Sequence, residues 1–332
     1  MRRYVVRRLA TLPLLMVGIS IISFLLLNFA PGDAAEITLK RQNSGISPSK
    51  EAVTALRQEL GLDASLPVRY GRWVSDAVRG DLGESYRTGS SISGELFRRM
   101  PATLLLATTA LALAVAVGIP LGILAAVKRG TWLDTACRML ALVGAAIPSY
   151  VMAPALMLLF AVKLDWLPAI GYGSPEQLIL PAVALSFGTM AQLMRLTRAS
   201  VLEVLGQDYM RTARAKGLTE TVIVWRHGLK NALLPVVTVL GTSTGYLLGG
   251  AIIIETIFGW PGVGQFMITG ITQRDYPVVQ GFVVYIAVIF LLVNLIVDIS
   301  YRWLDPRLPV SYTHLRAHET RHDLVCRLLL EK

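Results

Sequence analysis

The strongest constraint on this chain is that its apolar residues are grouped into long stretches without Asp, Glu, Lys or Arg. A helix needs about 20 such residues to cross a membrane, and each span must be helical because hydrocarbon offers backbone groups no partner. Six stretches meet or approach this length: 9–32, 100–127, 139–162, 177–194, 231–254 and 276–297. The fourth is the shortest, with Pro181 near its start. We therefore predict an all-α membrane protein with six transmembrane helices.

Composition disfavours a soluble globular protein. Of 332 residues, 54% are hydrophobic and 16% are charged, whereas soluble domains carry about 25% charged residues. The first stretch is too long for a signal peptide and lacks a small-residue cleavage pattern before Asp33, so we expect it to be a retained helix. Cys137 and Cys326 lie far apart without metal-ligand spacing, which indicates neither a disulfide framework nor a zinc site.

The basic residues predict an orientation, because short loops rich in Lys and Arg stay in the cytoplasm. The net charge is +10, and Arg2, Arg3, Arg7 and Arg8 place the N-terminus inside. With six spans, the segments 128–138 and 195–230 and the C-terminus are then cytoplasmic too. Segment 195–230 holds seven Lys or Arg against three acids, whereas 163–176 and 255–275 are nearly balanced. This placement of charge favours a membrane side over a nucleic-acid surface.

Two outside segments are predicted to carry local structure. Segment 33–99 is expected to form a small cap with one helix, for which Ser47 is the N-cap, Pro48 the first residue and Gly61 the end. Between the last two spans, the run from Glu255 to Gly264 breaks the helix at its Gly and Pro residues. A short interfacial helix over 265–271 then follows, with Trp260 at the depth of the lipid headgroups.

The segment 208–218 alternates small and basic residues and ends at Gly217. A short helix of this kind can dock its small side in a groove while its arginines reach acidic groups of a partner. The alternative is a plain cytoplasmic loop that carries positive charge.

The run 208–235 resembles the cytoplasmic "EAA" loop of ABC-importer permeases of the dipeptide/oligopeptide/nickel class. The resemblance extends over about 1–307 and rests on further motifs in order: Tyr4-Val-Val-Arg-Arg-Leu, Gly61-Leu-Asp, Gly80-Asp-Leu-Gly, Pro101-Ala-Thr-Leu, Glu255 with Trp260-Pro-Gly-Val-Gly, Arg274-Asp-Tyr-Pro and Leu304-Asp-Pro-Arg. The glutamate that names the loop is Arg211 here, so its contact with the ATPase is not carried over.

This resemblance implies a type I ABC-importer permease fold in a prokaryotic inner membrane, with both termini cytoplasmic. The implied domains are an N-terminal tail and first helix (1–32), a periplasmic cap (33–99) and a transmembrane core (100–307) with a coupling loop at 195–230. The remaining 308–332 is expected to be non-native or disordered. Its His314, His318 and His322 have helical metal-ligand spacing, but the surrounding string resembles adapter or vector sequence.

The resemblance also implies partners: a second homologous permease, two cytoplasmic ATP-binding subunits and an extracytoplasmic solute-binding protein. The coupling residues would be Arg211, Thr212, Ala213, Arg214, Ala215, Lys216 and Gly217. No GxxxxGK[ST] phosphate loop occurs in the sequence. We therefore expect no ATPase site, cofactor or metal in this chain, with ATP and magnesium bound by the partners.

Span five carries glycines at four-residue spacing, which permits a close helix approach within the bundle or to the second permease. These packing residues and the neighbouring candidates for the pathway lining are Gly241, Thr242, Ser243, Thr244, Gly245, Tyr246 and Gly249. The same run fits a GxSxG nucleophile pattern, but the only histidine outside the tail is His227 on the cytoplasmic loop, so an enzyme is not expected. The periplasmic motif comprises Glu255, Trp260, Pro261, Gly262, Gly264, Arg274, Asp275, Tyr276 and Pro277.

Three hypotheses follow, two on the substrate and one on the class of transporter. Di- and oligopeptides, including glutathione-like ones, are the first. A nickel chelate is the second, because Leu167-Pro-Ala-Ile-Gly-Tyr-Gly is similar to a stretch in nickel-type permeases. The third, from another class, is a secondary transporter working alone. The lack of ionisable residues inside the predicted spans disfavours it, since such transporters usually hold ions at mid-membrane depth.

Overall fold

The computed structural model describes residues 2–29, 35–36, 39, 48–59 and 61–304. These residues are almost entirely helical, and the only β pairing among them is an isolated bridge between Glu84 and Ser91. The chain divides after Leu295 into two compact units, of which the second is described only as the last turns of α14. Ser47 and the segment 308–332 lie outside the described residues.

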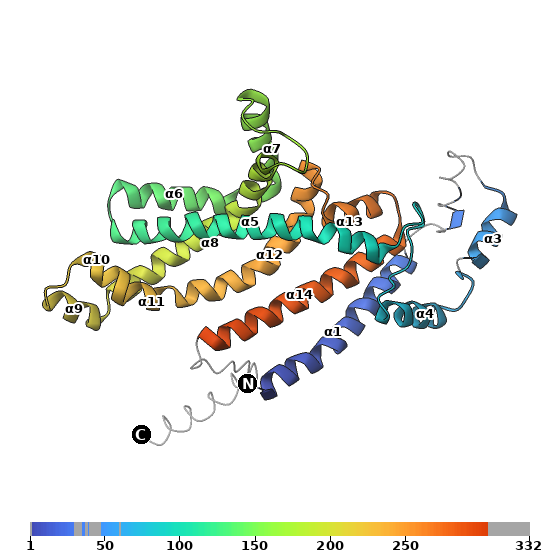
Figure 1. Ribbon diagram of the computed structural model, residues 1–332, viewed down its shortest axis with the longest axis horizontal. Helices are drawn as coiled ribbons and strands as arrows, with labels where there is room; N and C mark the ends of the chain where they lie inside the picture. Colours follow the sequence, from blue (N-terminus) through green and yellow to red (C-terminus); the bar gives the residue numbers. More distant parts are fainter. Residues whose placement is uncertain (1, 30–34, 37–38, 40–47, 60, 305–332) are drawn as a thin grey trace, which may run out of the picture. The chain divides into compact units, whose positions relative to one another are not determined.

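The helices follow the predicted apolar stretches in order (Figure 1). Their bounds are α1 (Arg2–Asn28), α3 (Lys50–Glu59), α4 (Leu66–Val78), α5 (Ile92–Val127), α6 (Trp132–Ala146), α7 (Ser149–Leu156), η1 (Met157–Lys163), α8 (Pro175–Leu205), α9 (Asp208–Ala215), α10 (Glu220–Val222), η2 (Ile223–Gly228), α11 (Leu229–Ala232), α12 (Leu234–Phe258), α13 (Val263–Thr272) and α14 (Tyr276–Leu304). The segments η1 and η2 are π-helical.

Among the described residues, three helices are long and apolar enough to span a membrane, and five if each of two bent pairs is one span. The three are α5, α8 and the part of α14 up to Val297. In α1, the apolar helix 12–28 falls just short in length. The all-α membrane architecture is therefore confirmed, while the number six stays a prediction.

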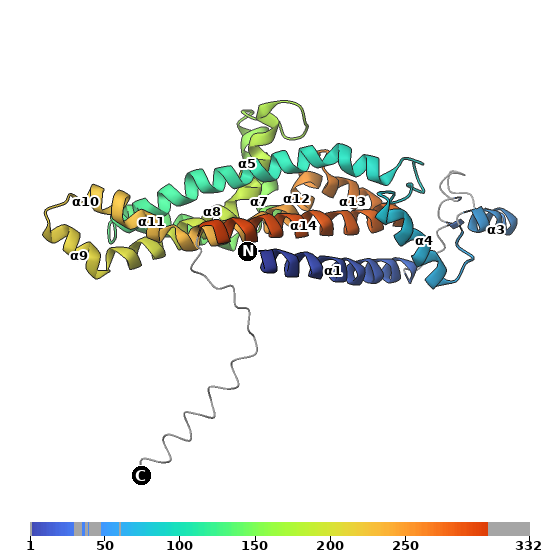
Figure 2. The same ribbon diagram turned by 60° about the horizontal axis from the view of Figure 1, so that its bottom comes forward.

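The centre of the bundle is the packing of α5 against α8, which lie side by side in both views (Figures 1 and 2). A Cβ on Gly118 would lie 2.8 Å from the carbonyl oxygen of Met190, and one on Gly122 would lie 2.7 Å from that of Met194. The two backbones therefore approach more closely than a larger side chain allows. Buried small or aliphatic residues extend this contact face at four-residue spacing: Ala102, Leu106, Ala110, Ala114, Gly118 and Gly122.

The predicted third span, 139–162, is wrong as a single helix. The chain turns by 106° between α6 and the α7–η1 segment. Pro148 has no N–H to donate and disfavours helical geometry at the residue before it. Ile147 accordingly adopts an extended conformation, with φ of −93° and ψ of 115°, and α6 ends at Ala146.

A buried ion pair joins the start of α6 to α8. Asp134 is 2% exposed and receives two hydrogen bonds from Arg198, whose Nε and Nη2 lie 2.7 and 2.9 Å from its carboxylate oxygens. The amide of Gly130 donates a third hydrogen bond to Asp134 at 3.1 Å. This bidentate geometry fixes the angle between the two helices at the end where the loop 195–230 begins.

The cap, defined here as the described residues from 48 to 91, contains two helices instead of the predicted one. Helix α3 begins at Lys50, two residues after the predicted Pro48, because the side chain of Ser49 accepts a hydrogen bond from the amide of Ala52. Gly61 ends this region with φ of +63°, as expected for a helix stop. The unpredicted helix α4 contacts α1, where Tyr70 and Ser20 hydroxyls lie 2.8 Å apart.

Candidate functional site

The loop between α8 and α12 folds into short helical segments at one end of the bundle (Figure 1). Helix α9 covers the predicted short helix, and Gly217 follows it with φ of +77°. Only glycine adopts this conformation at no steric cost, so Gly217 sets the sharp turn toward α10. The glycine amide donates to the carbonyl of Arg214 at 2.9 Å, which closes the turn.

One face of α9 is used within the loop itself. Met210 is fully buried and Ala213 is 8% exposed, and both pack on the buried Ile223 of η2. Ala213 thus packs within the loop itself, and the docking face predicted for this helix stays a prediction.

Arg214 also has a partner inside the loop. Its Nε donates to Glu220 at 2.7 Å, and its Nη1 donates to the carbonyl of Leu205 at 3.4 Å. The hydrogen bond from Arg214 lowers the pKa of Glu220 below its ordinary value. These bonds connect the end of α8, α9 and α10, so Arg214 holds the turn around Gly217 in shape.

The remaining predicted loop residues face outward. Arg211, Thr212, Ala215, Lys216 and Gly217 are all exposed. Apolar side chains are exposed beside them, among which Trp225 at 62% is the most open: Tyr209, Leu218, Val222 and Trp225. Cationic and aromatic groups together at the tip of a bundle are typical of a protein docking surface.

The glycines of span five do not share one environment. A Cβ on Gly245 would lie 2.5 Å from the ring of Phe290 on α14, whereas one on Gly249 would meet nothing within 4 Å. Gly245 thus serves packing within the bundle, Gly249 lies on an open face and Gly241 is half-buried. Ser243 is buried, and the hydroxyls of Thr242 and Thr244 donate to carbonyls of their own helix. The side chain of Tyr246 lies outside the described residues.

The carboxyl group of Glu255 organises the other end of α12. It is fully buried, and Thr103 on α5 donates to its Oε1 at 2.5 Å. The amides of Gly264 and Gln265, at the start of α13, donate to its Oε2 at 2.8 and 3.0 Å. Thr103 in turn accepts from the amide of Val263 at 3.0 Å. A carboxylate at a helix N-terminus satisfies free amides and complements the helix dipole, so Glu255 holds α13 against α12 and α5.

The glycines of this motif are required by the same arrangement. A Cβ on Gly262 would overlap the carboxyl group of Glu255, and one on Gly264 would overlap the backbone of Ile252. Trp260 is 1% exposed and its indole N–H donates to the carbonyl of Ala102 at 2.9 Å. The ring of Trp260 therefore lies inside the protein, and its depth relative to the lipid headgroups stays a prediction. Pro261 lies in the connection between α12 and α13.

Asp275 fastens the α13–α14 corner to the cap. It is 3% exposed and accepts from the hydroxyl of Ser85 at 2.6 Å and from the amide of Tyr86 at 3.2 Å. Arg274 makes the corner with φ of +53°, and Tyr276 and Pro277 begin α14. The predicted periplasmic motif is thus brought together as two neighbouring anchor points.

Sequence reasoning did not identify several residues of these anchors. Thr103 and Ala102 were noted only as part of a motif, and Ser85, Asp134 and Arg198 were not singled out. For Asp134 the signal was available, since it is an acid in the first turn of an apolar helix with basic residues on the next inside segment. The partner of Ser85 is 190 positions away, which no local pattern reveals.

Comparison with known families covers nearly all of the chain. Residues 118–310 match the family described as "Binding-protein-dependent transport system inner membrane component", and residues 1–107 match its N-terminal component. The dipeptide transport system permease protein DppB of Alkalihalophilus pseudofirmus is 39% identical over 93% of this chain and 99% of its own length. A putative peptide permease of Brucella suis biovar 1 is 40% identical over 94% and 100%. The glutathione transport system permease protein GsiC of Escherichia coli is 39% identical over 92% and 98%.

Solved structures give the same fold. A chain of the MetNI methionine ABC transporter in an inward-facing crystal form matches with a TM-score of 0.55 and 21% identity. The match covers 64% of this chain and 96% of that one. A second inward-facing crystal form matches with a TM-score of 0.51.

Proposed function

The chain belongs to the family of binding-protein-dependent transport system inner membrane components, and on that premise we propose that it is a permease subunit of an ATP-driven importer for di- and oligopeptides. The observation that carries the proposal is the similarity to permeases whose names specify dipeptides, peptides or glutathione. These relatives are 39–40% identical to this chain over more than nine tenths of its length. Glutathione is itself a small peptide, so these substrates share one chemistry. A nickel chelate is the less favoured substrate.

We propose that the loop 195–230 transmits the motion of a separate ATP-binding subunit. The docking surface is the exposed side of α9 and its flanking turns: Arg211, Thr212, Ala215, Lys216, Tyr209 and Trp225. Ala213 supports this surface by packing beneath it, and Arg214, which is itself exposed, supports it by the ion pair with Glu220. Because the turn is internally cross-linked, a displacement of α9 is passed to α8 and α11 instead of being absorbed by a soft loop.

A second homologous permease would complete the pathway. The α7–η1 segment projects from the bundle (Figure 1) and exposes apolar side chains that a partner subunit would cover: Tyr150, Val151, Leu158, Leu159 and Val162. Thr242 and Gly249 are the exposed pathway candidates on α12, since Ser243 and Gly245 are used inside this chain. A solute-binding protein would approach the cap on the opposite face of the membrane.

The proposed mechanism needs no ATP site in this chain, because ATP and magnesium would be bound by the partner subunits. Binding of ATP would close those subunits, shift α9 and favour the outward-open state of the pathway. Delivered peptide would enter that state, and hydrolysis would restore the inward-open one. A ligand shifts such an equilibrium only by its difference in affinity for the two states.

The test is ATP hydrolysis and peptide uptake by the reconstituted complex with Gly217→Pro. Proline cannot reach φ of +77° and lacks the N–H that closes the turn. We expect the complex to assemble but to lose solute-binding-protein-stimulated hydrolysis and uptake. Gly217→Asn is the control, since Asn tolerates this conformation and should retain most of both activities. Uptake by the purified chain alone in ATP-free vesicles would overturn the proposal in favour of a secondary transporter.

A further inference from the structure

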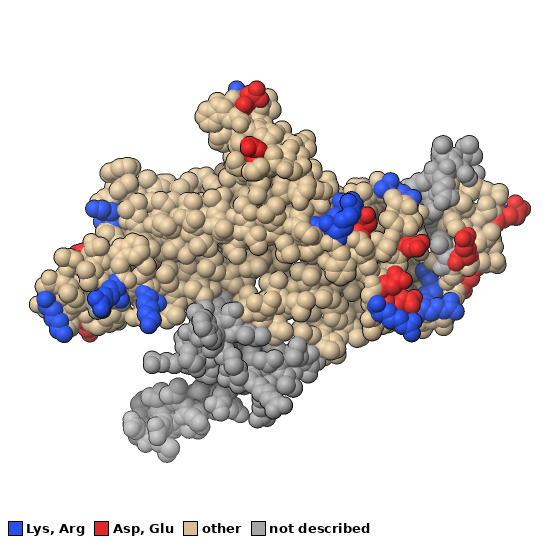
Figure 3. Space-filling model, in the orientation of Figure 1, with Lys and Arg blue, Asp and Glu red and all other residues tan. Residues whose placement is uncertain are grey.

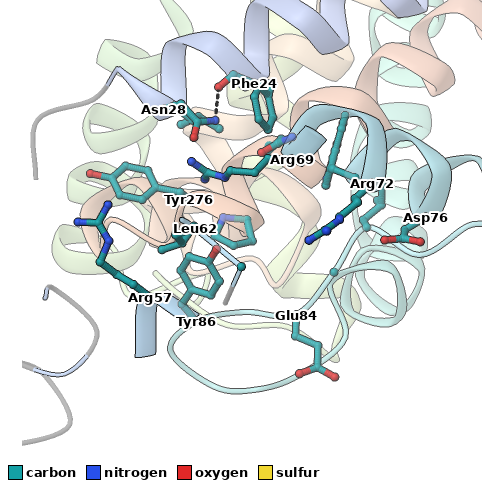
Figure 4. Close-up of a pocket in the computed structure, with 17 residues that line it drawn as sticks. Phe24, Asn28, Arg57, Leu62, Arg69, Arg72, Asp76, Glu84, Tyr86 and Tyr276 are labelled. Atoms are coloured by element: carbon teal, nitrogen blue, oxygen red, sulfur yellow. Dashed lines mark hydrogen bonds between the residues drawn. The ribbon is translucent and has the colours of Figure 1, made fainter. Parts of the chain in front are cut away.

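A cavity of about 570 Å³ lies where the C-terminal end of α1, the cap and the start of α14 meet (Figure 4). Its lining comes from three parts of the chain far apart in sequence, namely α1, the cap from α3 to the loop 82–86, and the start of α14. None of the loop and span residues assigned to coupling or to the pathway lines it. The cavity therefore calls for an explanation of its own.

The lining is rich in positive charge and in hydrogen-bond donors. Arg57, Arg69 and Arg72 all contribute, together with Tyr86 and Tyr276 (Figure 4). Arg57 also pairs with Asp63 at 3.3 Å. The carboxylates of Asp76 and Glu84 also belong to the lining, and both residues are exposed. The carboxylate of Glu84 is directed away from the guanidinium groups (Figure 4). Arginine forks of this kind recognise phosphate and carboxylate oxygens.

One residue of the lining carries an unsatisfied polar group. Gln280 on α14 is 8% exposed, and its buried Nε2 has no hydrogen-bond partner among the described residues. An unsatisfied buried amide is costly, and a bound oxyanion would supply the missing acceptor. Tyr86 is half-buried beside Arg69, and burial raises the pKa of its hydroxyl while the Arg69 charge opposes this. The hydroxyl therefore stays protonated at neutral pH and adds a further donor.

The position of the cavity indicates where such an oxyanion would come from. It adjoins the ends of two apolar helices, α1 and α14, which run side by side in both views (Figures 1 and 2). Helix α1 exposes large apolar side chains just before the cavity, including Ile22 at 60% and Leu26 at 68%. Trp73 and Tyr276 also line the cavity, and such aromatic residues are enriched in the headgroup region of membranes.

We infer that this cavity binds a phosphate oxyanion, supplied by the headgroup of an anionic phospholipid whose acyl chains lie along the exposed face of α1. The arginines would hold the phosphate, Gln280 would donate to one of its oxygens, and Phe24 and Leu27 would contact the start of the acyl chains. Bound lipid would then brace α1 and the cap against α14. The alternative source of the same chemistry is free phosphate from solution.

The experiment measures lipid retained by the full-length chain. Protein reconstituted with equal phosphatidylglycerol and phosphatidylcholine is re-extracted in detergent, and the bound lipid is quantified by mass spectrometry. We expect wild type to retain phosphatidylglycerol preferentially, and Arg69→Gln with Arg72→Gln to lower that retention about tenfold. Gln280→Leu should lower it less. Arg87→Gln is the control, since Arg87 is an exposed cap arginine that lies outside the cavity lining.

Competition with inorganic phosphate distinguishes bound lipid from free phosphate as the source of the oxyanion. Because it uses wild-type protein, it does not depend on a variant that folds. Retention by wild type that resists millimolar inorganic phosphate supports the lipid, whereas displacement by phosphate supports the oxyanion site with free phosphate as its ligand. Equal retention of both lipids with no effect of phosphate would overturn the inference. Displacement by a dipeptide but not by phosphate would also overturn it, because the cavity would then belong to the transport substrate.

Discussion

At the scale of single residues, Glu255 is the position where one substitution should cost most. Removing its carboxyl group leaves the Thr103 hydroxyl and two amides at the start of α13 without an acceptor in a buried site. Each unsatisfied buried group costs about 1–3 kcal/mol, so Glu255→Ala should destabilise the chain by on the order of 3 kcal/mol. Thermal unfolding of the purified chain, followed by tryptophan fluorescence, measures this.

The matched control for this prediction is Thr256→Ala on the same helix. The hydroxyl of Thr256 is exposed and donates only to the carbonyl of Ile252, so its loss should leave the unfolding temperature nearly unchanged. Glu255→Gln should fall between the two, because one amide oxygen still accepts but the amide nitrogen cannot. Unfolding temperatures for Glu255→Ala and Thr256→Ala that coincide would contradict the role assigned to Glu255.

At the residue scale, the sequence predicted where helices end but not which residues far apart in sequence form hydrogen bonds. Gly217 and Gly61 end their helices as expected, because positive φ is a local property of the chain. The Glu255 motif was recognised, but its partner Thr103 is 152 positions away, and the hydrogen bond from Trp260 to the carbonyl of Ala102 spans 158 positions. Periodicity and composition carry no information on which distant atoms meet.

At the scale of elements, the approach of α12 and α13 depends on Gly264. A Cβ at this position would overlap backbone atoms of Ile252, which cannot move aside as a flexible side chain can. Gly264→Ala should therefore destabilise the chain by about 1–3 kcal/mol, the range for overpacked sites. Gly249→Ala is its control on α12, where a Cβ meets nothing within 4 Å and alanine should stabilise the helix by about 0.5–1 kcal/mol.

Both variants are compared in the chain alone and in the complete transporter. A Gly249→Ala chain that is stable alone but fails to bind a second permease would place that open face in the subunit interface. Equal unfolding temperatures for Gly264→Ala and wild type would show that the two helices lie farther apart than described here. From the sequence alone, the glycines of span five could pack within this chain or against a second permease. A four-residue spacing defines one face of a helix but not which helix contacts that face.

The positions of the long helices were the easiest feature to predict from sequence, and the positions of the helix breaks were the hardest. Charge-free length located α5, α8, α12 and α14, since burying a charge in hydrocarbon is costly enough to be visible in sequence. The break at Pro148 was missed because apolar residues continue on both sides of it, so the stretch reads as one span. In the cap, α4 was missed although Ser65 and Pro67 form an ordinary helix start.

At the scale of the whole molecule, the distribution of charged residues indicates which segments lie outside the membrane. Basic side chains gather over α9 to α11, basic and acidic ones gather together around α4, and a few charged side chains lie at the tip of the projecting α7 region, with a wide uncharged surface between these places (Figure 3). The segment 195–230 carries seven basic residues against three acids, and the N-terminus carries four arginines within its first eight residues. The loop and the N-terminus are therefore expected in the cytoplasm and the cap outside.

Cysteine accessibility tests this orientation directly. The two cysteines of the sequence are replaced by Cys137→Ala and Cys326→Ser, and single cysteines are introduced at exposed positions by Arg87→Cys in the cap and Lys216→Cys in the loop. A membrane-impermeant maleimide should label the Arg87→Cys protein in intact cells and the Lys216→Cys protein only after the membrane is opened. Each variant serves as the control for the other, because both positions are exposed in the folded chain. The reverse labelling pattern would place the loop outside and out of reach of an ATP-binding partner, since ATP is hydrolysed in the cytoplasm. Labelling of both variants in intact cells would contradict a chain that crosses the membrane between positions 87 and 216.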